Sequence, residues 1–150
     1  MKTITPLSET YKELGIAFTF PIEIKDDNGN ETYFEDEGGY WYRREYNEDG
    51  KVTYSENSNG LWWRYEYDEK GKETYFEESD GYWCRCEYDK KGNKTYSETS
   101  TGIWLRREYD KDGKKTYFEN SYGDKEGTKR SSCDGKVIEV DGKKYKLIEL

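Results

Sequence analysis

Three cysteine thiols are the strongest nucleophiles in this sequence, and two of them, Cys84 and Cys86, lie two residues apart. In an extended strand such residues point to the same face, so these two thiols are predicted to be neighbours. A structural zinc site needs four ligands, and the third thiol, Cys133, lies far along the chain. We therefore interpret the cysteines as small buried side chains and expect no metal site.

The remaining side chains do not form a recognisable catalytic set. The sequence contains no histidine, which excludes Ser-His-Asp and Cys-His arrangements. Asp26-Asp27-Asn28-Gly29 is similar to the start of a calcium loop, but the glutamate that should complete the loop is missing. No Gly-Lys-Ser/Thr phosphate loop is present. We predict that the protein is not an enzyme and uses no cofactor.

Composition indicates a thin, aromatic sheet. Charged residues make up 39% and hydrophobic residues 31% of the chain, a balance that by itself is typical of disorder. The 16 tyrosines, five tryptophans and five phenylalanines argue against disorder, because such side chains pack while remaining partly wet.

The charge and the cysteine count limit the binding partners and the cellular compartment that we expect. The net charge of -8 disfavours direct binding to nucleic acid. No apolar run is long enough to cross a membrane, and the first ten residues do not resemble a secretory signal. An odd number of cysteines fits a reducing compartment. We expect a cytoplasmic protein, in the host cell cytoplasm if a phage encodes it.

The chain repeats itself every 21 residues. One glycine series consists of Gly29, Gly50, Gly71, Gly92 and Gly113, and a second of Gly39, Gly60, Gly81, Gly102 and Gly123. A Thr-Tyr pair follows each glycine of the first series by three residues. Aromatic and threonine-rich strands therefore alternate with glycine turns, and each final glycine is expected to supply the positive φ of a type I turn followed by a bulge.

Alternation along each strand places the invariant residues on one face. The candidate binding surface comprises a tryptophan row and a glutamate row: Trp41, Trp62, Trp83, Trp104, Glu45, Glu66, Glu87 and Glu108. Arginines at the intervening positions, such as Arg85, separate the two rows. Two interpretations remain open. The rows either build the sheet, with arginine packed beside tryptophan and paired with glutamate, or form an aromatic binding strip. On the opposite face, Phe34, Ser55, Phe76 and Ser97 alternate, which indicates a 42-residue duplication.

Residues 1–25 are predicted to form an N-terminal cap. Its short helix spans residues 6–14, with Thr5 as the N-cap, Pro6 as the first helical residue and Gly15 as the stop. A strand over residues 16–25 is expected to lead into the hairpin array.

The array is predicted to span residues 26–123, and residues 124–150 form the C-terminal part. Residues 124–134 read as a polar loop, and a hairpin around Asp141-Gly142 closes the chain. The predicted fold is mainly β: an antiparallel meander of tandem hairpins, with a short N-terminal helix and a C-terminal hairpin. Whether this sheet is flat, coiled or closed is left open.

The array resembles a known type of repeat. The spacing Asp-x-x-Gly, nine residues, Gly, six residues, Tyr-Asp runs through residues 68–89 and 89–110. It is similar to the YD repeats of Rhs-type proteins, which build large shells around polymorphic toxins from many more units. The invariant tryptophan and the Thr-Tyr pair depart from that pattern. The whole layout also resembles small proteins of bacteriophages and other mobile elements, and this likeness implies an accessory or counter-defence role.

Three functions follow as expectations. The first is a non-catalytic protein-binding protein, such as a phage-encoded inhibitor of a bacterial defence complex of the anti-CRISPR or another anti-defence type. Its partner would be a host protein or a protein–nucleic-acid complex. The second is a carbohydrate- or ligand-binding module that uses the tryptophan rows, as the similar choline- and glucan-binding repeats do. The third is a structural or virion scaffold protein, whose open sheet edges would allow self-association.

Overall fold

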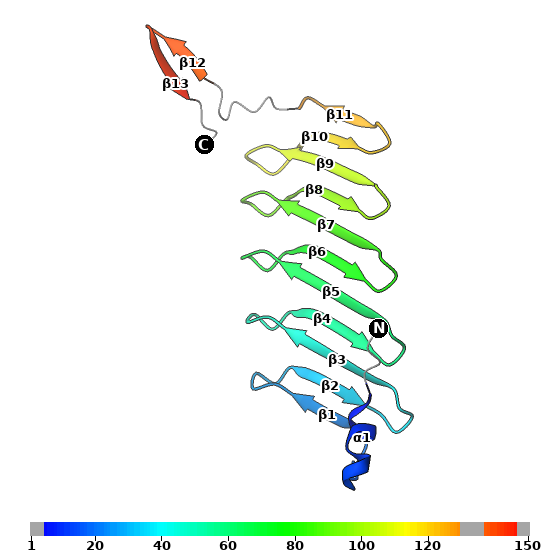
Figure 1. Ribbon diagram of the computed structural model, residues 1–150. Helices are drawn as coiled ribbons and strands as arrows, with labels where there is room; N and C mark the ends of the chain where they lie inside the picture. The colour runs from blue at the N-terminus through cyan, green and yellow to red at the C-terminus, as the bar shows by residue number, and fades with distance from the viewer. Residues whose placement is uncertain (1–4, 130–136, 147–150) are drawn as a thin grey trace.

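A single open sheet of eleven antiparallel strands makes up most of the molecule (Figure 1). The computed structural model describes residues 5–129 and 137–146. Every strand of the large sheet pairs with its neighbours in sequence. The strands are β1 (Ile22–Lys25), β2 (Glu31–Glu35), β3 (Trp41–Tyr46), β4 (Val52–Asn57), β5 (Trp62–Tyr67), β6 (Glu73–Glu78), β7 (Trp83–Tyr88), β8 (Lys94–Thr99), β9 (Trp104–Tyr109), β10 (Lys115–Asn120) and β11 (Lys125–Gly127). The predicted hairpin meander is confirmed, and the sheet is not closed.

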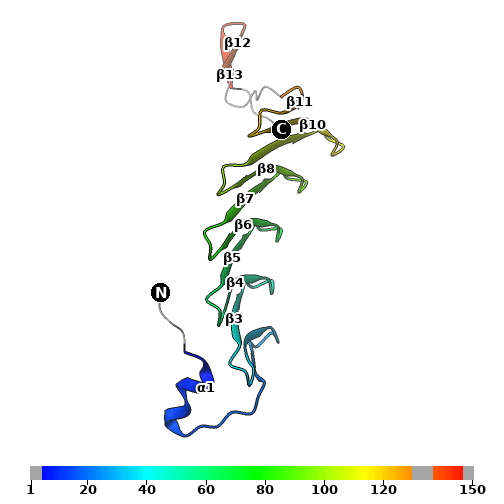
Figure 2. The ribbon, with the colours of Figure 1, turned by 90° about the vertical axis from the view of Figure 1, so that its right-hand side faces the viewer.

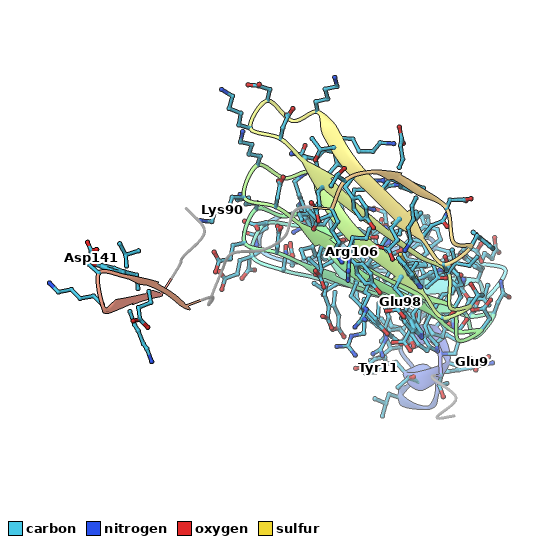
Figure 3. All side chains as sticks on the ribbon, turned by 90° about the horizontal axis from the view of Figure 1, so that it is seen from above. Glu9, Tyr11, Lys90, Glu98, Arg106 and Asp141 are labelled. Atoms are coloured by element: carbon cyan, nitrogen blue, oxygen red, sulfur yellow. The ribbon has the colours of Figure 1, made fainter. Side chains whose placement is uncertain are left out.

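The sheet is one layer thick, as the view along its edge shows (Figure 2). Side chains project from both faces of the stacked strands (Figure 3). Among the described residues, the buried hydrophobic side chains are Ile22, Trp41, Cys86 and Tyr117. Most other aromatic rings are half-buried. Cross-strand contacts between large side chains therefore stabilise the fold in place of a two-layer core.

Each turn has the predicted geometry, as the turn between β7 and β8 illustrates. The Gly92 N–H donates to the Asp89 carbonyl at 2.9 Å, and the Asp89 N–H donates to the Asn93 carbonyl at 2.9 Å. This pattern is a type I turn closed by a bulge, and Gly92 has a φ of 86°. The Asp89 carboxylate accepts the Lys91 and Asn93 N–H groups, which lowers the pKa of Asp89 despite partial desolvation.

Threonine and tyrosine hydroxyls bond to backbone carbonyls beside the bulges. The pairing of β7 with β8 shifts register after Glu87, and the Thr95 hydroxyl there donates to the Glu87 carbonyl at 3.2 Å. The Tyr88 hydroxyl donates to the Glu73 carbonyl at 2.9 Å. The same bond recurs 21 residues apart along the array, from Tyr46, Tyr67 and Tyr109.

The N-terminal segment forms α1 (Leu7–Thr10) and a 3-10 turn, η1 (Lys12–Leu14). Gly15 follows in a left-handed conformation with a φ of 71°, so the predicted stop is confirmed. The expected N-cap was wrong by one residue. Pro6, with an extended ψ of 153°, is the N-cap in place of Thr5. The N–H groups of Leu7 and Ser8 at the helix start donate to side chains of the sheet.

Two strand boundaries differ from the prediction. The strand expected over residues 16–25 begins only at Ile22, because Ile22 pairs with Glu35, the last residue of β2. Earlier residues would have no partner strand, and Pro21 lacks an N–H. At the other end, residues 124–134 were expected to be a loop, yet Lys125–Gly127 form β11. Its backbone pairs with β10, so side-chain type did not decide the outcome.

The C-terminal hairpin is a separate two-stranded sheet of β12 (Val137–Val140) and β13 (Lys143–Lys146). Asp141 and Gly142 both have positive φ, 50° and 73°, which is the type I′ turn that an Asp-Gly pair favours. The hairpin prediction is confirmed. Residues 130–136, including Cys133, and residues 147–150 lie outside the described residues.

Candidate binding surface

One face of the sheet carries the predicted invariant rows, and we call it the tryptophan face. Trp41 is 6% exposed, whereas Trp62, Trp83 and Trp104 are half-buried. In the glutamate row, Glu45, Glu66 and Glu87 are exposed and Glu108 is half-buried. All eight predicted residues therefore lie on one continuous surface, and most of that surface is open to contact.

A second glutamate row on the same face was missed from the sequence. It consists of Glu35, Glu56, Glu77, Glu98 and Glu119. Each lies two residues after an invariant tyrosine, and four of the pairs show a tyrosine hydroxyl that donates to the glutamate, at 2.5 to 3.2 Å. The 21-residue spacing was the signal that could have revealed this row.

Glutamates of the second row form ion pairs with arginines of neighbouring strands. Arg43 forms an ion pair with Glu56, and Arg85 forms one with Glu98 at 2.5 Å. The Arg85 guanidinium lies 5.7 Å from the centre of the Tyr96 ring. Arg64 pairs with Glu66 of the predicted row, on its own strand, at 2.7 Å. Arg43 and Arg85 therefore pack over tyrosine rings and bridge neighbouring strands, where packing against tryptophan was expected.

At the first strand pair, helix α1 lies on the tryptophan face. The Leu7 N–H donates to the Tyr33 hydroxyl at 3.1 Å, and the Ser8 N–H donates to the Glu35 carboxylate at 3.2 Å. The Ser8 hydroxyl donates to the same carboxylate. Glu35 is consequently only 1% exposed. The sheet thus supplies the cap that the start of α1 needs.

The helix takes the place of an arginine. The residues that face the second glutamate row across each strand pair are Arg43, Arg64, Arg85 and Arg106, but Glu35 faces Ile22. A buried carboxylate without a partner is strongly destabilising. The N–H and hydroxyl groups of Ser8 in α1 provide this partner for Glu35. The Arg85 guanidinium provides it for Glu98.

Burial alters the ionisation of the tyrosines on this face. Desolvation, supported by the hydrogen bond to Glu35, raises the pKa of Tyr33 to about 12. Desolvation also raises the pKa of Tyr54 and Tyr75. For Tyr117 the hydrogen bond to Glu119 is the first cause of a raised pKa. These hydroxyls stay protonated at neutral pH and act as donors.

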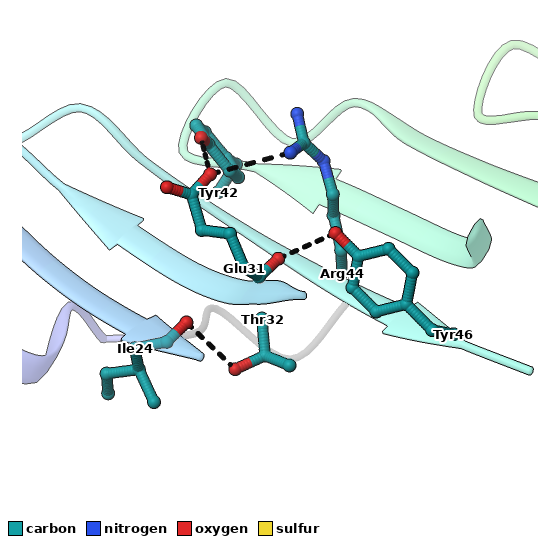
Figure 4. Close-up of polar contacts among 6 residues, drawn as sticks. All are labelled: Ile24, Glu31, Thr32, Tyr42, Arg44 and Tyr46. Carbon is teal, nitrogen blue, oxygen red and sulfur yellow. Dashed lines mark hydrogen bonds and ion pairs between the residues drawn. The ribbon is translucent and has the colours of Figure 1, made fainter. Parts of the chain in front are cut away.

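The opposite face, which we call the variable face, differs from repeat to repeat. Near β2, the Tyr42 hydroxyl contacts Glu31, and Arg44 lies 3.5 Å from the same carboxylate (Figure 4). Figure 4 also shows Tyr46 bonded to the Glu31 carbonyl at 2.8 Å. On β7 the same positions hold Cys84 and Cys86, whose sulfurs are 3.9 Å apart, as their spacing predicted.

Within residues 5–129 and 137–146, no group of three or more potential metal ligands is present. The helices described are too short and too polar to cross a membrane.

Comparisons with known proteins bear on the fold alone. No family model and no curated protein matches the chain. The structure is similar to a Photorhabdus luminescens Tc holotoxin pore carrying a TccC3 mutation, with 18% identity and a TM-score of 0.50. It is also similar to the crystal structure of TcdB2-TccC3-TEV, with 18% identity and a TM-score of 0.52. Each match covers 67% of this chain but only 5% of the larger one. The chain is thus a tandem β-hairpin meander with structural neighbours among Tc toxin chains, which are YD-repeat proteins.

Proposed function

We propose that this chain is a non-catalytic protein-binding protein, and that the tryptophan face beyond β3 is its contact surface. The observation that carries the proposal is α1. In the first strand pair, a peptide segment of this chain already lies on that face and bonds to a tyrosine–glutamate pair. The same pair recurs in each later strand pair, beside tryptophans that remain half-exposed. A partner segment would contact the half-exposed tryptophans and the exposed glutamates of this face.

The partner would be a protein in bacterial cytoplasm. The negative net charge disfavours the nucleic-acid backbone itself. Across eleven strands, a sheet of about 48 Å carries far less charge per length than a DNA duplex, so mimicry of DNA along the whole sheet is weak. A narrower form of the proposal is inhibition of a bacterial defence complex through a local acidic patch of the exposed glutamates.

The test uses two variants with the same change in charge. In the first, Glu66→Arg and Glu87→Arg alter the tryptophan face; in the second, Glu48→Arg and Glu69→Arg alter exposed turns. Captures from bacterial lysate with the wild-type chain and both variants are compared by quantitative mass spectrometry. We expect the turn variant to capture a partner as the wild type does, and the face variant to capture at least about tenfold less of it. Charges at the rim of an interface govern the rate of association. Equal capture by both variants would reject the surface.

The defence arm is tested separately, by plaque formation on a strain whose immune system is active. Expression of the wild-type chain is expected to restore plaques, and the face variant is expected to fail. No restoration by the wild type would remove the anti-defence role while leaving protein binding intact.

A second candidate is a carbohydrate-binding module. Half-exposed Trp62, Trp83 and Trp104 recur on every second strand, about 9.5 Å apart, a spacing that suits several weak sites acting together. A third candidate, a structural scaffold, is favoured by the open edges at β1 and β11 and by the likeness to Tc toxin chains. A glycan array with tryptophan fluorescence tests the second. Sedimentation over a range of concentrations tests the third, since a constant monomer would argue against it.

A further inference from the structure

The cysteines of β7 form a site of their own on the variable face, away from the surface proposed for protein binding. The sulfurs of Cys84 and Cys86 are 3.9 Å apart. Cys86 is 8% exposed and Cys84 is half-buried, so one sulfur is sheltered and the other faces the solvent side. Equivalent positions elsewhere in the array hold bulky side chains: Tyr42 and Arg44, Trp63 and Tyr65, Leu105 and Arg107.

The cross-strand neighbours of the thiol pair are small on one side and aromatic on the other. Across the strand pair with β8, Cys86 faces Ser97 and Cys84 faces Thr99, both of them small. On the other side, Cys84 faces Phe76. Lys94 faces Tyr88 across the same strand pair, and its ammonium lies 5.8 Å from the centre of the Tyr88 ring. The result is a dithiol with a lysine and aromatic rings near it.

The separation of the sulfurs suits a bridging metal better than a disulfide. Residues two apart in a strand have Cα atoms about 6.7 Å apart, at the upper end of the range that a disulfide spans. A metal ion bound about 2.3 Å from each sulfur would instead have a sulfur–metal–sulfur angle of about 116°. That angle is close to trigonal, and a third position would remain open for a donor from solution.

We propose that Cys84 and Cys86 form a two-thiolate site for a soft monovalent metal ion of the Cu(I) class. Thiolates select such ions, whereas zinc requires four ligands that the described residues do not supply. On binding, two S–H bonds break, two copper–sulfur bonds form, and two protons pass to the buffer without any change in oxidation state. The product carries one net negative charge, which the Lys94 ammonium neutralises.

The test titrates the reduced full-length chain with Cu(I), without oxygen, against a chromophoric copper chelator. We expect one ion per chain and a sulfur-to-copper absorption band. Replacement of a ligand, Cys84→Ser or Cys86→Ser, should weaken binding by more than about 100-fold, beyond the cost of losing an outer-shell group. Cys133→Ser is the matched control and should bind as the wild type does. Zinc should not compete.

Lys94 has its own control, because Lys115 occupies the equivalent position one repeat later, beside Leu105 and Arg107. Lys94→Met should weaken copper binding by about tenfold, as outer-shell changes do, while Lys115→Met should leave it unchanged. Equal effects of these two variants would overturn the role of Lys94.

A measurement on the wild-type chain keeps the test independent of folding defects in the serine variants. Bound Cu(I) should protect Cys84 and Cys86, but not Cys133, from alkylation, as read by peptide mass spectrometry. Equal protection of all three thiols, or wild-type affinity in the Cys84→Ser variant, would overturn the site.

Discussion

The N-terminal edge of the sheet and the inner strands stabilise the glutamates of the second row in different ways. Both place a glutamate of the second row on the tryptophan face, two residues after a tyrosine. In two inner strand pairs an arginine on the neighbouring strand neutralises it, as Arg43 does for Glu56 and Arg85 does for Glu98. At the edge, Ile22 stands where the arginine would be, and the start of α1 binds Glu35. The inner glutamates of the second row stay half-buried, whereas Glu35 at the edge is buried.

This difference shows how a repeat array ends without exposing an unpaired strand face. At the edge, the preceding strand has no arginine opposite Glu35, so a different segment must supply the hydrogen-bond donors for this carboxylate. A helix start does so by bonding to Glu35 and to Tyr33, whose ring stacks on the buried Trp41. The edge gains burial, while the inner strands keep an accessible surface. We expect the two regions to differ in the free energy that their side chains contribute, as they differ in exposure.

The largest difference is expected for the tryptophans. Trp41→Ala should lower the free energy of unfolding by about 4 kcal/mol, because a buried indole is lost together with its stacking on Tyr33, the residue that bonds to α1. Trp104→Ala, in a half-buried position, should cost about 2 kcal/mol. Urea unfolding followed by far-UV circular dichroism measures both. Equal costs would mean that α1 adds nothing to the edge.

The glutamates should show a smaller contrast. Glu35→Ala removes a carboxylate that accepts bonds from Ser8 and Tyr33, and should cost about 3 kcal/mol. Glu98→Ala breaks a partly exposed ion pair and should cost about 1 kcal/mol. Hydrogen exchange at residues 7–10 should speed up only in the first variant. Unchanged exchange there would contradict the docking of α1 through Glu35.

The closing tyrosines should behave alike in both regions, because they bond to the backbone on the variable face. Tyr46→Phe and Tyr88→Phe each remove one hydrogen bond to a carbonyl, of 2.8 and 2.9 Å. Each should lower the free energy of unfolding by about 1 kcal/mol in urea. A clear difference between the two variants would show that the edge is strengthened on both faces, not on the tryptophan face alone.

The smallest effect at neutral pH concerns the ionisation of Tyr33, whose pKa is raised from 10 to about 12. In the folded chain this hydroxyl keeps its proton in a range where the unfolded chain loses it. Its contribution to stability is therefore complete below pH 10 and is lost as the pH rises towards 12. The urea midpoint of the wild type should fall more steeply across that range than that of Tyr33→Phe. Tyr122→Phe, at a 72% exposed position, should follow the wild type.

Several features were predictable because their causes are local. An Asp-x-x-Gly segment specifies its own turn, and the turn sets the register of the strands on either side, so the tryptophan row and the Cys84–Cys86 pair followed by alternation. Strand β11 was missed because its pairing to β10 depends on backbone groups, which Lys125-Glu126-Gly127 supplies as well as any other tripeptide. The second glutamate row repeats every 21 residues and could have been found from that spacing. Its ion pairs with arginine depend on contacts between strands, which the spacing does not give.

The sequence by itself determined the architecture: the 21-residue period, the turns, the antiparallel order and the face on which each residue lies. Those properties arise from interactions within a few residues, where φ preferences and two-residue alternation dominate. Only the tertiary structure decided which glutamate meets which arginine and that α1 docks on Tyr33 and Glu35. Such contacts depend on register and on the docking of segments distant in sequence, and no local preference specifies them.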